Sequence, residues 1–260
     1  MGLMDIAFSP CPNDTFIFCK VAHEPDIRAH LFDVEQLNGF AFEERFDVTK
    51  LSFHAWLALR ERYALLEVGA ALGRGCGPLV ITRGERALPA GARVALPGTW
   101  TTAHLLFQLW FGETVEKVFM PFHEIMDALA VGEVDAGVII HEGRFVFEER
   151  GFECVQDLGA WWEEETGLPI PLGCIAVRRN LGKEVISGFE QRLQESIEWA
   201  FEKPSATESY VREHAQELDN RVMEEHIKTY VNQFTLGLGD EGRAAVAELE
   251  RRAVEAGVIQ

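Results

Sequence analysis

The sequence predicts a two-lobed α/β fold with mostly parallel sheets flanked by helices and with a helical C-terminal segment. In the first two thirds of the chain, short apolar segments alternate with amphipathic ones, which is typical of strands joined by helices. From residue 183 the strand pattern stops, and residues 183–256 have the periodicity of three or four amphipathic helices. Two places are expected to be chain crossings between lobes: one near Gly91 at residues 91–93, and one at residues 167–173, where glycine and proline interrupt the chain.

Eight strands and five helices are expected ahead of the helical segment. The strands are expected at residues 6–8, 48–51, 79–82, 94–96, 117–120, 136–140, 154–158 and 174–178. The helices are expected to begin near Asp14, Val34, Phe53, Thr102 and His123. Gly132 is expected to end the last of these helices, because glycine readily adopts the left-handed conformation that closes a helix.

The two crossings divide the chain into lobes. Residues 1–92 and 174–260 are expected to form a large discontinuous α/β lobe, and residues 93–173 a smaller inserted α/β lobe. An insertion of this length suffices for a unit of ordinary domain size. Such a chain places a ligand cleft between the lobes, and we expect the lobes to close over the ligand about the two crossings.

Composition and charge exclude some classes of function. The 260 residues are 47% hydrophobic and 25% charged, as in a globular protein, and their formal net charge is −18. This charge disfavours binding to nucleic acid or to an anionic membrane surface. A small anionic substrate must therefore be held by local dipoles and a few positioned donors.

The N-terminal residues and the cysteines predict a cytoplasmic protein. Residues 1–5 carry no basic region, and Pro10 and Pro12 break the apolar segments that follow. The five cysteines are an odd number without a CxxC pair, and the histidines have no paired ligand spacing. We therefore expect reduced thiols and no metal site.

Residues 9–16, Ser-Pro-Cys-Pro-Asn-Asp-Thr-Phe, form an expected strand-to-helix turn. Two prolines keep the turn out of the helix, and Asn13, Asp14 and Thr15 can each cap the helix that follows. Open α/β sheets bind ligands at such turns, so Asn13 is a candidate ligand contact. The alternative is a well-capped helix with nothing bound. Cys11 is either a thiol activated by the helix start or, the favoured interpretation, a small packed side chain.

His141 is the strongest catalytic candidate. It follows residues 136–140, a continuous apolar run typical of a strand buried on both faces, and so belongs at the carboxyl edge of a sheet. Imidazole has an ordinary pKa of about 6.5 and can accept and return protons at neutral pH. Glu142 can orient the ring or remain solvated. The alternative is that His141 only ends the strand.

The turn at residues 97–104 repeats this strand-to-helix pattern. Thr101 has a hydroxyl, and Thr102 and Ala103 have free backbone amides at the expected helix start. These groups suit a carboxylate or a phosphate, although a simple threonine cap would have the same sequence.

Two further segments carry weaker signals. Residues 49–53 end one strand and begin a helix, where Lys50 offers a cation and Ser52 a cap or a ligand contact. Residues 73–78 are rich in glycine but lack the Gly-Lys-Ser/Thr ending of a phosphate-binding loop, which predicts a tight turn.

Taken together, several blocks resemble the 1,4-dihydroxy-6-naphthoate synthase family of the futalosine route to menaquinone. They are SPCPNDTFIF (9–18), TKLSF (49–53), GRGCGPLV (73–80), the PG..TTA turn (97–103), VIIHEGRF (138–145), DLGAWWEEETGLPIPLG (157–173) and YVNQF (230–234). The blocks lie in the family's order and span the chain. SPCPNDTFIF and WWEEETGLPIPLG are specific, whereas a TTA turn alone is not.

The resemblance implies a fold like that of type II periplasmic binding proteins. It also implies a carbon–carbon lyase that converts cyclic dehypoxanthinyl futalosine to 1,4-dihydroxy-6-naphthoate and a dihydroxyacetone fragment. His141 is then the general base, and the substrate-contacting segments map to Lys50, Leu51 and Ser52 and to Thr102 and Ala103. Proton removal beside a carbonyl, followed by aromatisation, needs no metal, nucleotide or redox cofactor, so no cofactor is expected.

Two departures and two competing functions remain. Cys76 stands in the glycine turn, and Gly143 stands where a serine is common in the family. One competing function is a cytosolic protein or sensor of the same fold that binds a small carboxylate, because fold alone does not separate binder from enzyme. The other is a prephenate-like lyase acting on a different carboxylate. A base-competent His141 and the expected absence of an export signal favour the synthase.

Overall fold

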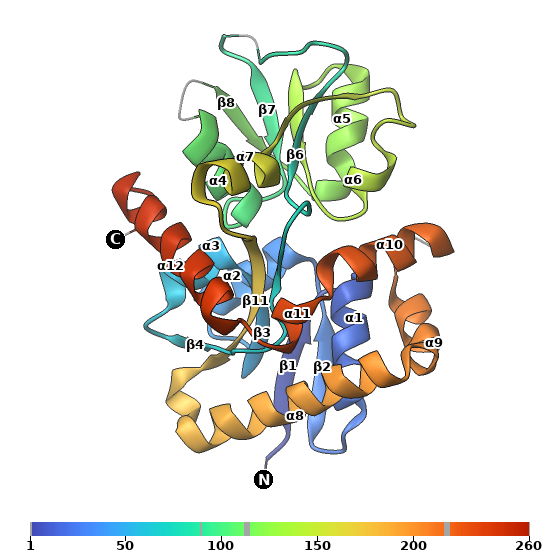
Figure 1. Cartoon of the computed structure of the whole chain (residues 1–260), viewed down its shortest axis with the longest axis vertical. Helices are drawn as coiled ribbons and strands as arrows, with labels where there is room; N and C mark the ends of the chain where they lie inside the picture. The colour runs from blue at the N-terminus through green and yellow to red at the C-terminus, as the bar shows by residue number, and fades with distance from the viewer. Residues whose placement is uncertain (1, 89, 112–114, 216–218, 260) are drawn as a thin grey trace.

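The chain forms two β-sheets flanked by helices in a computed structural model that describes residues 2–88, 90–111, 115–215 and 219–259 (Figure 1). The first sheet has the order β2-β1-β3-β11-β4, with β5 also paired to β11. Its strands are β1 (Met4–Phe8), β2 (Ile27–Leu31), β3 (Val48–Ser52), β4 (Tyr63–Leu65), β5 (Ala71–Gly73) and β11 (Ile170–Arg178). The second sheet has the order β10-β6-β9-β7-β8. Its strands are β6 (Leu79–Thr82), β7 (Arg93–Leu96), β8 (Glu116–Phe119), β9 (Ala136–Ile139) and β10 (Glu153–Asp157).

Helices connect the strands and then make up the C-terminal segment. The connecting helices are α1 (Pro12–Phe18), α2 (Val34–Phe42), α3 (Phe53–Leu59), α4 (Thr102–Phe111), α5 (Ile125–Val131), α6 (Gly143–Val146) and α7 (Leu158–Thr166). The C-terminal helices are α8 (Lys183–Glu202), α9 (Pro204–His214), α10 (Asn220–Tyr230), α11 (Gln233–Leu236) and α12 (Gly239–Glu255). Short 3-10 helices lie at Val21–His23, Phe122–Glu124 and Arg179–Leu181.

The elements agree closely with the sequence prediction. Each of the eight expected strands lies on an observed strand, and the five expected helices are α1 to α5. Gly132 closes α5 with a φ of 79°, as expected. The prediction missed β2, β4, β5, α6 and α7, most of which are short. It also expected three or four C-terminal helices, where the described residues form five, one of them the four-residue α11.

The sheets are mixed rather than mostly parallel, which corrects one part of the prediction. β1 pairs in parallel with β2 and β3, and β7 with β8 and β9. β11 runs antiparallel to β3, β4 and β5, and β6 runs antiparallel to β9 and β10. The exceptions are the strands next to the two crossings: β6 enters the second sheet and β11 re-enters the first, each against the direction of its neighbours.

The first crossing between the sheets lies earlier than expected. β6 pairs with β9 and β10 in the second sheet, so the chain crosses at residues 74–78 and not near 91–93. On the return, residues 170–173 already belong to β11 and pair with β5 in the first sheet. The two passages touch closely, because a Cβ on Gly77 would lie 2.3 Å from the backbone of Gly159. Both positions therefore need glycine.

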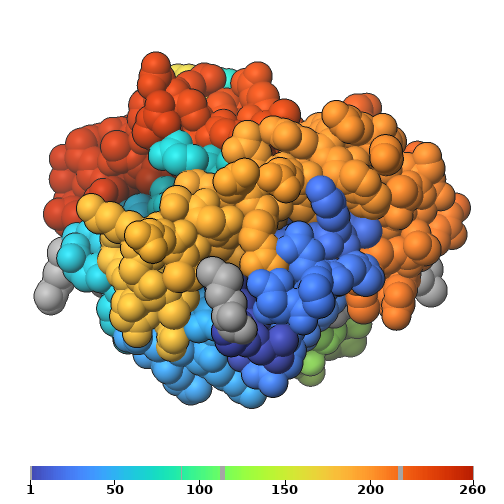
Figure 2. Space-filling view, turned by 90° about the horizontal axis from the view of Figure 1, so that it is seen from below, coloured from blue at the N-terminus to red at the C-terminus, as the bar shows by residue number. Residues whose placement is uncertain are grey.

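The apolar core continues from one sheet to the other. One cluster joins Leu51 of β3, in the first sheet, to Val80 of β6 and Val94 of β7, in the second sheet. The same cluster includes Phe107 of α4 and Trp162 of α7. In Figure 1, α12 lies beside the return passage of the chain, and it packs against β11 and α4. From below, α8 lies across the end of the molecule next to the N-terminal residues (Figure 2). Among the described residues, the structure contains no helix with the length and apolar character of a membrane span.

Candidate active site

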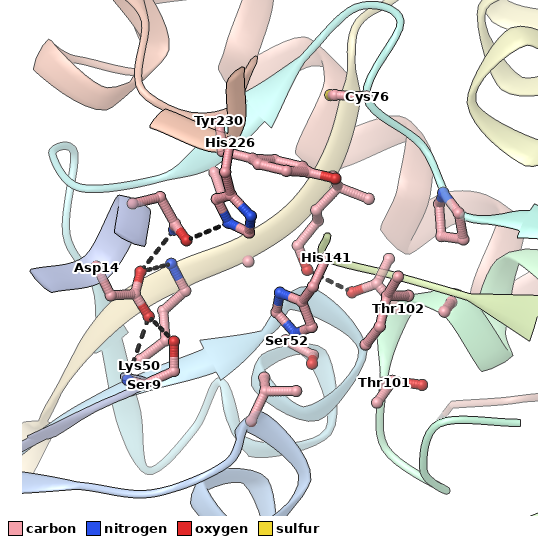
Figure 3. A pocket seen from close by; sticks show the side chains of 18 residues that line it. Ser9, Asp14, Lys50, Ser52, Cys76, Thr101, Thr102, His141, His226 and Tyr230 are labelled. Atoms are coloured by element: carbon pink, nitrogen blue, oxygen red, sulfur yellow. Dashed lines mark hydrogen bonds and ion pairs between the residues drawn. The ribbon is translucent and has the colours of Figure 1, made fainter. Parts of the chain in front are cut away.

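A pocket lies between the two sheets and encloses about 640 Å³ of empty space, its open mouth included (Figure 3). Its walls come from both halves of the molecule: the turns after β1 and β7, the end of β9, strands β3, β5 and β11, the first crossing, and α10. Its polar lining residues are Ser9, Asn13, Asp14, Lys50, Ser52, Cys76, Thr101, Thr102, His141, His226 and Tyr230.

The β1–α1 segment (residues 9–15) is built differently from the sequence prediction. Helix α1 begins at Pro12, with Cys11 at the N-cap position and no side chain of the described residues capping it. Proline is tolerated at the first helical position because its missing N–H would have no helical partner there. Asn13 and Asp14 therefore do not cap the helix, and both line the pocket.

A buried ion pair occupies this side of the pocket. Lys50 Nζ lies 2.7 Å from Asp14 Oδ1, and both side chains are almost completely buried. The Ser9 hydroxyl donates to Asp14 Oδ2 at 2.7 Å. The cation that the sequence predicted for an anionic ligand is thus already paired with a carboxylate.

The ion pair extends to a histidine of the C-terminal helices. Asn13 Nδ2 donates to Asp14 Oδ1 at 2.8 Å, and Asn13 Oδ1 lies 2.9 Å from Nε2 of His226 on α10. Burial, together with the positive charges of His141 and Lys50, lowers the pKa of His226 well below its ordinary value. His226 is therefore neutral at physiological pH.

His141 lies beside this network, with 6.0 Å between the centroids of its ring and the ring of His226. Its φ of 54° is in the left-handed region, which is uncommon for a residue other than glycine and is often found at functional positions. Its Nδ1 lies 3.5 Å from Cys11 Sγ, and its Nε2 is buried without a hydrogen-bond partner among the described residues. Burial disfavours the charged ring, but the Cys11 sulfur and the Glu142 carboxylate outweigh it and raise the pKa of His141 to about 9.

The β7–α4 segment (residues 97–103) lines the pocket on the side of the second sheet. Thr101 Oγ1 accepts from His104 N and donates to Gly98 O, so Thr101 caps α4. Thr102 Oγ1 donates to Leu172 O at 2.7 Å and links this segment to β11. The first backbone amides of a helix have no partner inside that helix, so the amides of Thr102 and Ala103 can serve a ligand.

Two buried histidines and a glutamate hold the β7–α4 segment in place. Nδ1 of His104 lies 2.8 Å from Thr99 O, and Nδ1 of His54 lies 3.3 Å from Thr101 O. Burial lowers the pKa of His54 to about 4 and also lowers the pKa of His104, so both rings are neutral donors to these carbonyls. The amide of Trp100 donates to the Glu35 carboxylate of α2.

Ser52 offers a hydroxyl to the pocket. Asn38 Nδ2 donates to Ser52 Oγ at 3.1 Å, and Ser52 N donates to Asn38 Oδ1 at 3.0 Å. Because the Ser52 oxygen already accepts from Asn38, its own hydrogen can be donated to a ligand.

The structure brings most of the expected site residues together. Those that line one pocket are Asn13, Lys50, Ser52, Thr101, Thr102, Ala103 and His141. Leu51 differs, because its side chain is completely buried in the shared core. Successive side chains of a strand point to opposite faces, so Leu51 points away from the face that carries Lys50 and Ser52.

The sequence interpretation missed His226, Tyr230 and Asn38. His226 and Tyr230 are four residues apart on α10 and face inward together. Their spacing is the only sequence signal, and it is equally typical of an ordinary buried helix face. Asn38 lies outside the pocket lining and acts through Ser52, which no local pattern indicates.

The two departures from the family pattern have simple surroundings. Burial raises the pKa of the Cys76 thiol to about 12, so this thiol stays protonated in the pocket wall. A Cβ at Gly143 would meet Ile139 at 3.4 Å, which is an ordinary contact, so the surroundings tolerate a Cβ at this position. Within the described part of the chain, no three His, Cys, Asp or Glu side chains are arranged to hold a metal ion.

Comparisons with known proteins identify the family of the chain. A family model described as "Menaquinone biosynthesis" matches residues 4–255. A 1,4-dihydroxy-6-naphtoate synthase from Streptomyces coelicolor is 45% identical over 98% of this chain and 94% of its own length. A 1,4-dihydroxy-6-naphtoate synthase from Thermus thermophilus is 45% identical over 99% of this chain and 96% of its own length.

Solved structures show the same fold. A crystal structure of a protein from Archaeoglobus fulgidus superposes with a TM-score of 0.93 at 36% identity, covering 98% of both chains. The periplasmic aliphatic sulphonate binding protein of Escherichia coli superposes with a TM-score of 0.65 at 10% identity, covering 98% of this chain and 88% of its own. The expected fold, like that of periplasmic binding proteins, is thus confirmed.

Proposed function

The chain belongs to the menaquinone biosynthesis family, and we propose that it is a 1,4-dihydroxy-6-naphthoate synthase. Its substrate is cyclic dehypoxanthinyl futalosine, and its products are 1,4-dihydroxy-6-naphthoate and a dihydroxyacetone fragment. It acts as a carbon–carbon lyase without a cofactor. The observation that carries the proposal is the buried Nε2 of His141, which has no hydrogen-bond partner among the described residues and belongs to a pocket-lining side chain.

His141 acts as the general base. In the neutral form of the ring, Nδ1 carries the hydrogen and donates to Cys11 Sγ, which leaves the lone pair of Nε2 for a proton next to a substrate carbonyl. Negative charge around the ring raises its pKa to about 9, which stabilises the imidazolium that forms on proton transfer. Loss of the proton lets the bond to the leaving fragment break, the fragment departs with the electron pair and takes a proton back from the His141 imidazolium, and aromatisation of the remaining ring drives the reaction.

The substrate carboxylate binds to hydrogen-bond donors from two segments that line the pocket. The amides of Thr102 and Ala103 supply donors from the side of the second sheet, and the hydroxyl of Ser52 supplies one from the first sheet. Thr101 positions these amides by capping α4. This arrangement suits a protein with a net charge of −18, because the anion is held by dipoles close to it.

Two lobes and a cytoplasmic location complete the proposal. The lobes correspond to the two sheets and their helices, and the pocket lies between them. The lobes close about residues 74–78 and 167–169, where the chain passes between the sheets. The five cysteines are free thiols in the structure, which suits a reducing cytoplasm.

Turnover of the cyclic substrate tests the function directly. The purified protein is incubated with cyclic dehypoxanthinyl futalosine, and 1,4-dihydroxy-6-naphthoate is measured by chromatography. A carboxylate-binding protein of the same fold would bind the substrate and return it unchanged. A lyase for a different carboxylate would give no naphthoate product either.

His141→Asn tests the base. We expect kcat to fall at least ~10²-fold with substrate affinity largely kept, because only the proton transfer is removed. His123→Asn is the matched control, since His123 is an exposed histidine outside the pocket lining. Wild-type turnover in His141→Asn would exclude the base role.

A further inference from the structure

A second imidazole lies beside the proposed base. The rings of His141 and His226 are 6.0 Å apart between centroids, with 9° between their planes, and both line the pocket (Figure 3). His226 comes from α10, in the C-terminal helical segment, and its side chain is almost completely buried. The reaction derived above gives it no role.

A chain of hydrogen bonds fixes which nitrogen of His226 carries the hydrogen. The carboxylate of Asp14 only accepts, so the Asn13 group 2.8 Å from it must be the amide NH₂. The other end of that amide, the oxygen Oδ1, therefore faces His226 at 2.9 Å. An amide oxygen only accepts as well, so Nε2 of His226 must donate its hydrogen.

The remaining nitrogen of His226 is consequently a free acceptor. Nδ1 carries a lone pair, is buried and has no partner within the described ranges of the chain. Buried polar atoms are nearly always hydrogen-bonded, so an unpartnered one on a pocket-lining side chain calls for a ligand. Burial, together with His141 and Lys50, disfavours a positive charge on the ring and keeps this lone pair available.

We propose that Nδ1 of His226 accepts a hydrogen bond from a hydroxyl group of the substrate and thereby positions it beside His141. This role rests on the proposed function, because the ligand is the hydroxylated substrate of that reaction. His226 is a positioning residue and not a second base, since its neighbourhood makes it a weak proton acceptor. The pair Lys50–Asp14 acts through Asn13 to set the acceptor, which gives the buried ion pair a functional role.

Two substitutions separate the acceptor from its anchor. In His226→Gln the terminal amide lies near the Nε2 position and can still donate to Asn13, but the acceptor at Nδ1 is lost. In His226→Asn the amide lies near the Nδ1 position and can still accept, but the contact with Asn13 is lost. We expect His226→Gln to raise KM about tenfold or more, with a smaller change in kcat, and His226→Asn to keep a KM closer to that of the wild type.

Nitrogen NMR of protein labelled with ¹⁵N-histidine provides a readout that does not depend on turnover. In the free protein, Nε2 of His226 should be protonated and Nδ1 should not. The cyclic substrate is then added to the His141→Asn variant, where it is bound and not consumed, and the Nδ1 resonance should move in the direction of hydrogen-bond acceptance.

The outcomes distinguish this inference from the proposed function. If the wild type makes no naphthoate product, the proposed function fails, whatever His226 does. If the wild type turns over, the inference is overturned by an unchanged KM in His226→Gln, by equal rises of KM in both variants, or by a substrate-insensitive or protonated Nδ1. A variant that does not fold leaves the NMR result on the His226-containing protein to decide.

Discussion

The β1–α1 and β7–α4 segments look alike in sequence but do different work in the pocket. Each follows a strand, contains proline, and leads into a helix through several polar residues. In the β1–α1 segment the polar groups satisfy one another, since Asp14 bonds Lys50, Ser9 and Asn13. In the β7–α4 segment, His104 and His54 bond the backbone carbonyls of Thr99 and Thr101, and the first amides of α4 have no partner inside the helix.

The difference shows how one structural unit can serve two roles. The β1–α1 segment is a closed network that orients side chains, among them His226 through Asn13 and His141 through Cys11. The β7–α4 segment is, in the function proposed above, a donor site for the substrate, and His54, His104 and Glu35 hold its backbone in place. Removing a charge from the β1–α1 network should therefore lower the free energy of unfolding more than removing one hydroxyl from the β7–α4 segment does, because it leaves a buried charge unpaired.

The largest effect is expected from Lys50→Met. This change leaves the Asp14 carboxylate buried without its cation, which should lower the free energy of unfolding by about 3–5 kcal/mol and abolish most activity. Urea denaturation measures the first effect and steady-state turnover the second. Arg243→Met is the control, since it breaks only exposed ion pairs and should lower the free energy of unfolding far less than Lys50→Met.

A double variant sharpens this test. Lys50→Met combined with Asp14→Asn removes both charges, so a substantial part of the lost stability should return while activity stays low. A double variant no more stable than Lys50→Met alone would mean that the unpaired carboxylate is not the cause.

An intermediate effect is expected from Cys11→Ala. With the pKa of His141 raised to about 9, the neutral base becomes more abundant as the pH rises, so kcat/KM of the wild type should increase up to about pH 9. Burial lowers this pKa, and Cys11→Ala removes the main group that opposes burial, which leaves only the smaller effects of Glu142 and Asp33 to raise it. The rising limb should therefore move to lower pH, as a pH–rate profile would show.

The same shift has a consequence for stability. Because the pKa of His141 is raised in the folded state, its protonation stabilises the fold below about pH 6.5, and this stabilisation is lost as the pH rises through about 9. Cys11→Ala should flatten this dependence in urea denaturation measured at several pH values. Profiles of rate and stability that coincide with those of the wild type would contradict the role of Cys11.

The smallest effect is expected from Thr101→Ala in the β7–α4 segment. It removes the cap of α4 and should cost about 0.5–2 kcal/mol of stability, with a rise in KM of a few fold because the amides of Thr102 and Ala103 lose their positioning. Thr207→Ala is the control, as Thr207 bonds Pro204 O on α9 away from the pocket lining. A control variant that raises KM equally would indicate a general loss of stability and no local role.

The sequence by itself determined the local elements and the chemistry-bearing residues at their ends. The strand at residues 136–139 and the helix starting at Thr102 follow from patterns of neighbouring residues, because periodicity and capping depend on atoms a few positions apart. His141 and Ser52 were found in the same way, since each stands directly at the end of a strand. The left-handed backbone conformation of His141 could not be predicted in this way, because its φ of 54° depends on what surrounds the turn.

Only the tertiary structure decided which of these residues act together. Pairings such as Lys50 with Asp14, 36 positions apart, and His226 with Asn13, 213 positions apart, leave no periodic trace in the chain. Helix α1 likewise starts at Pro12 without a cap from Asn13 or Asp14, because both side chains bond to distant residues that line the pocket. The physical reason is that a buried polar group must find a partner, and the fold as a whole, more than the local sequence, fixes which partner lies within reach.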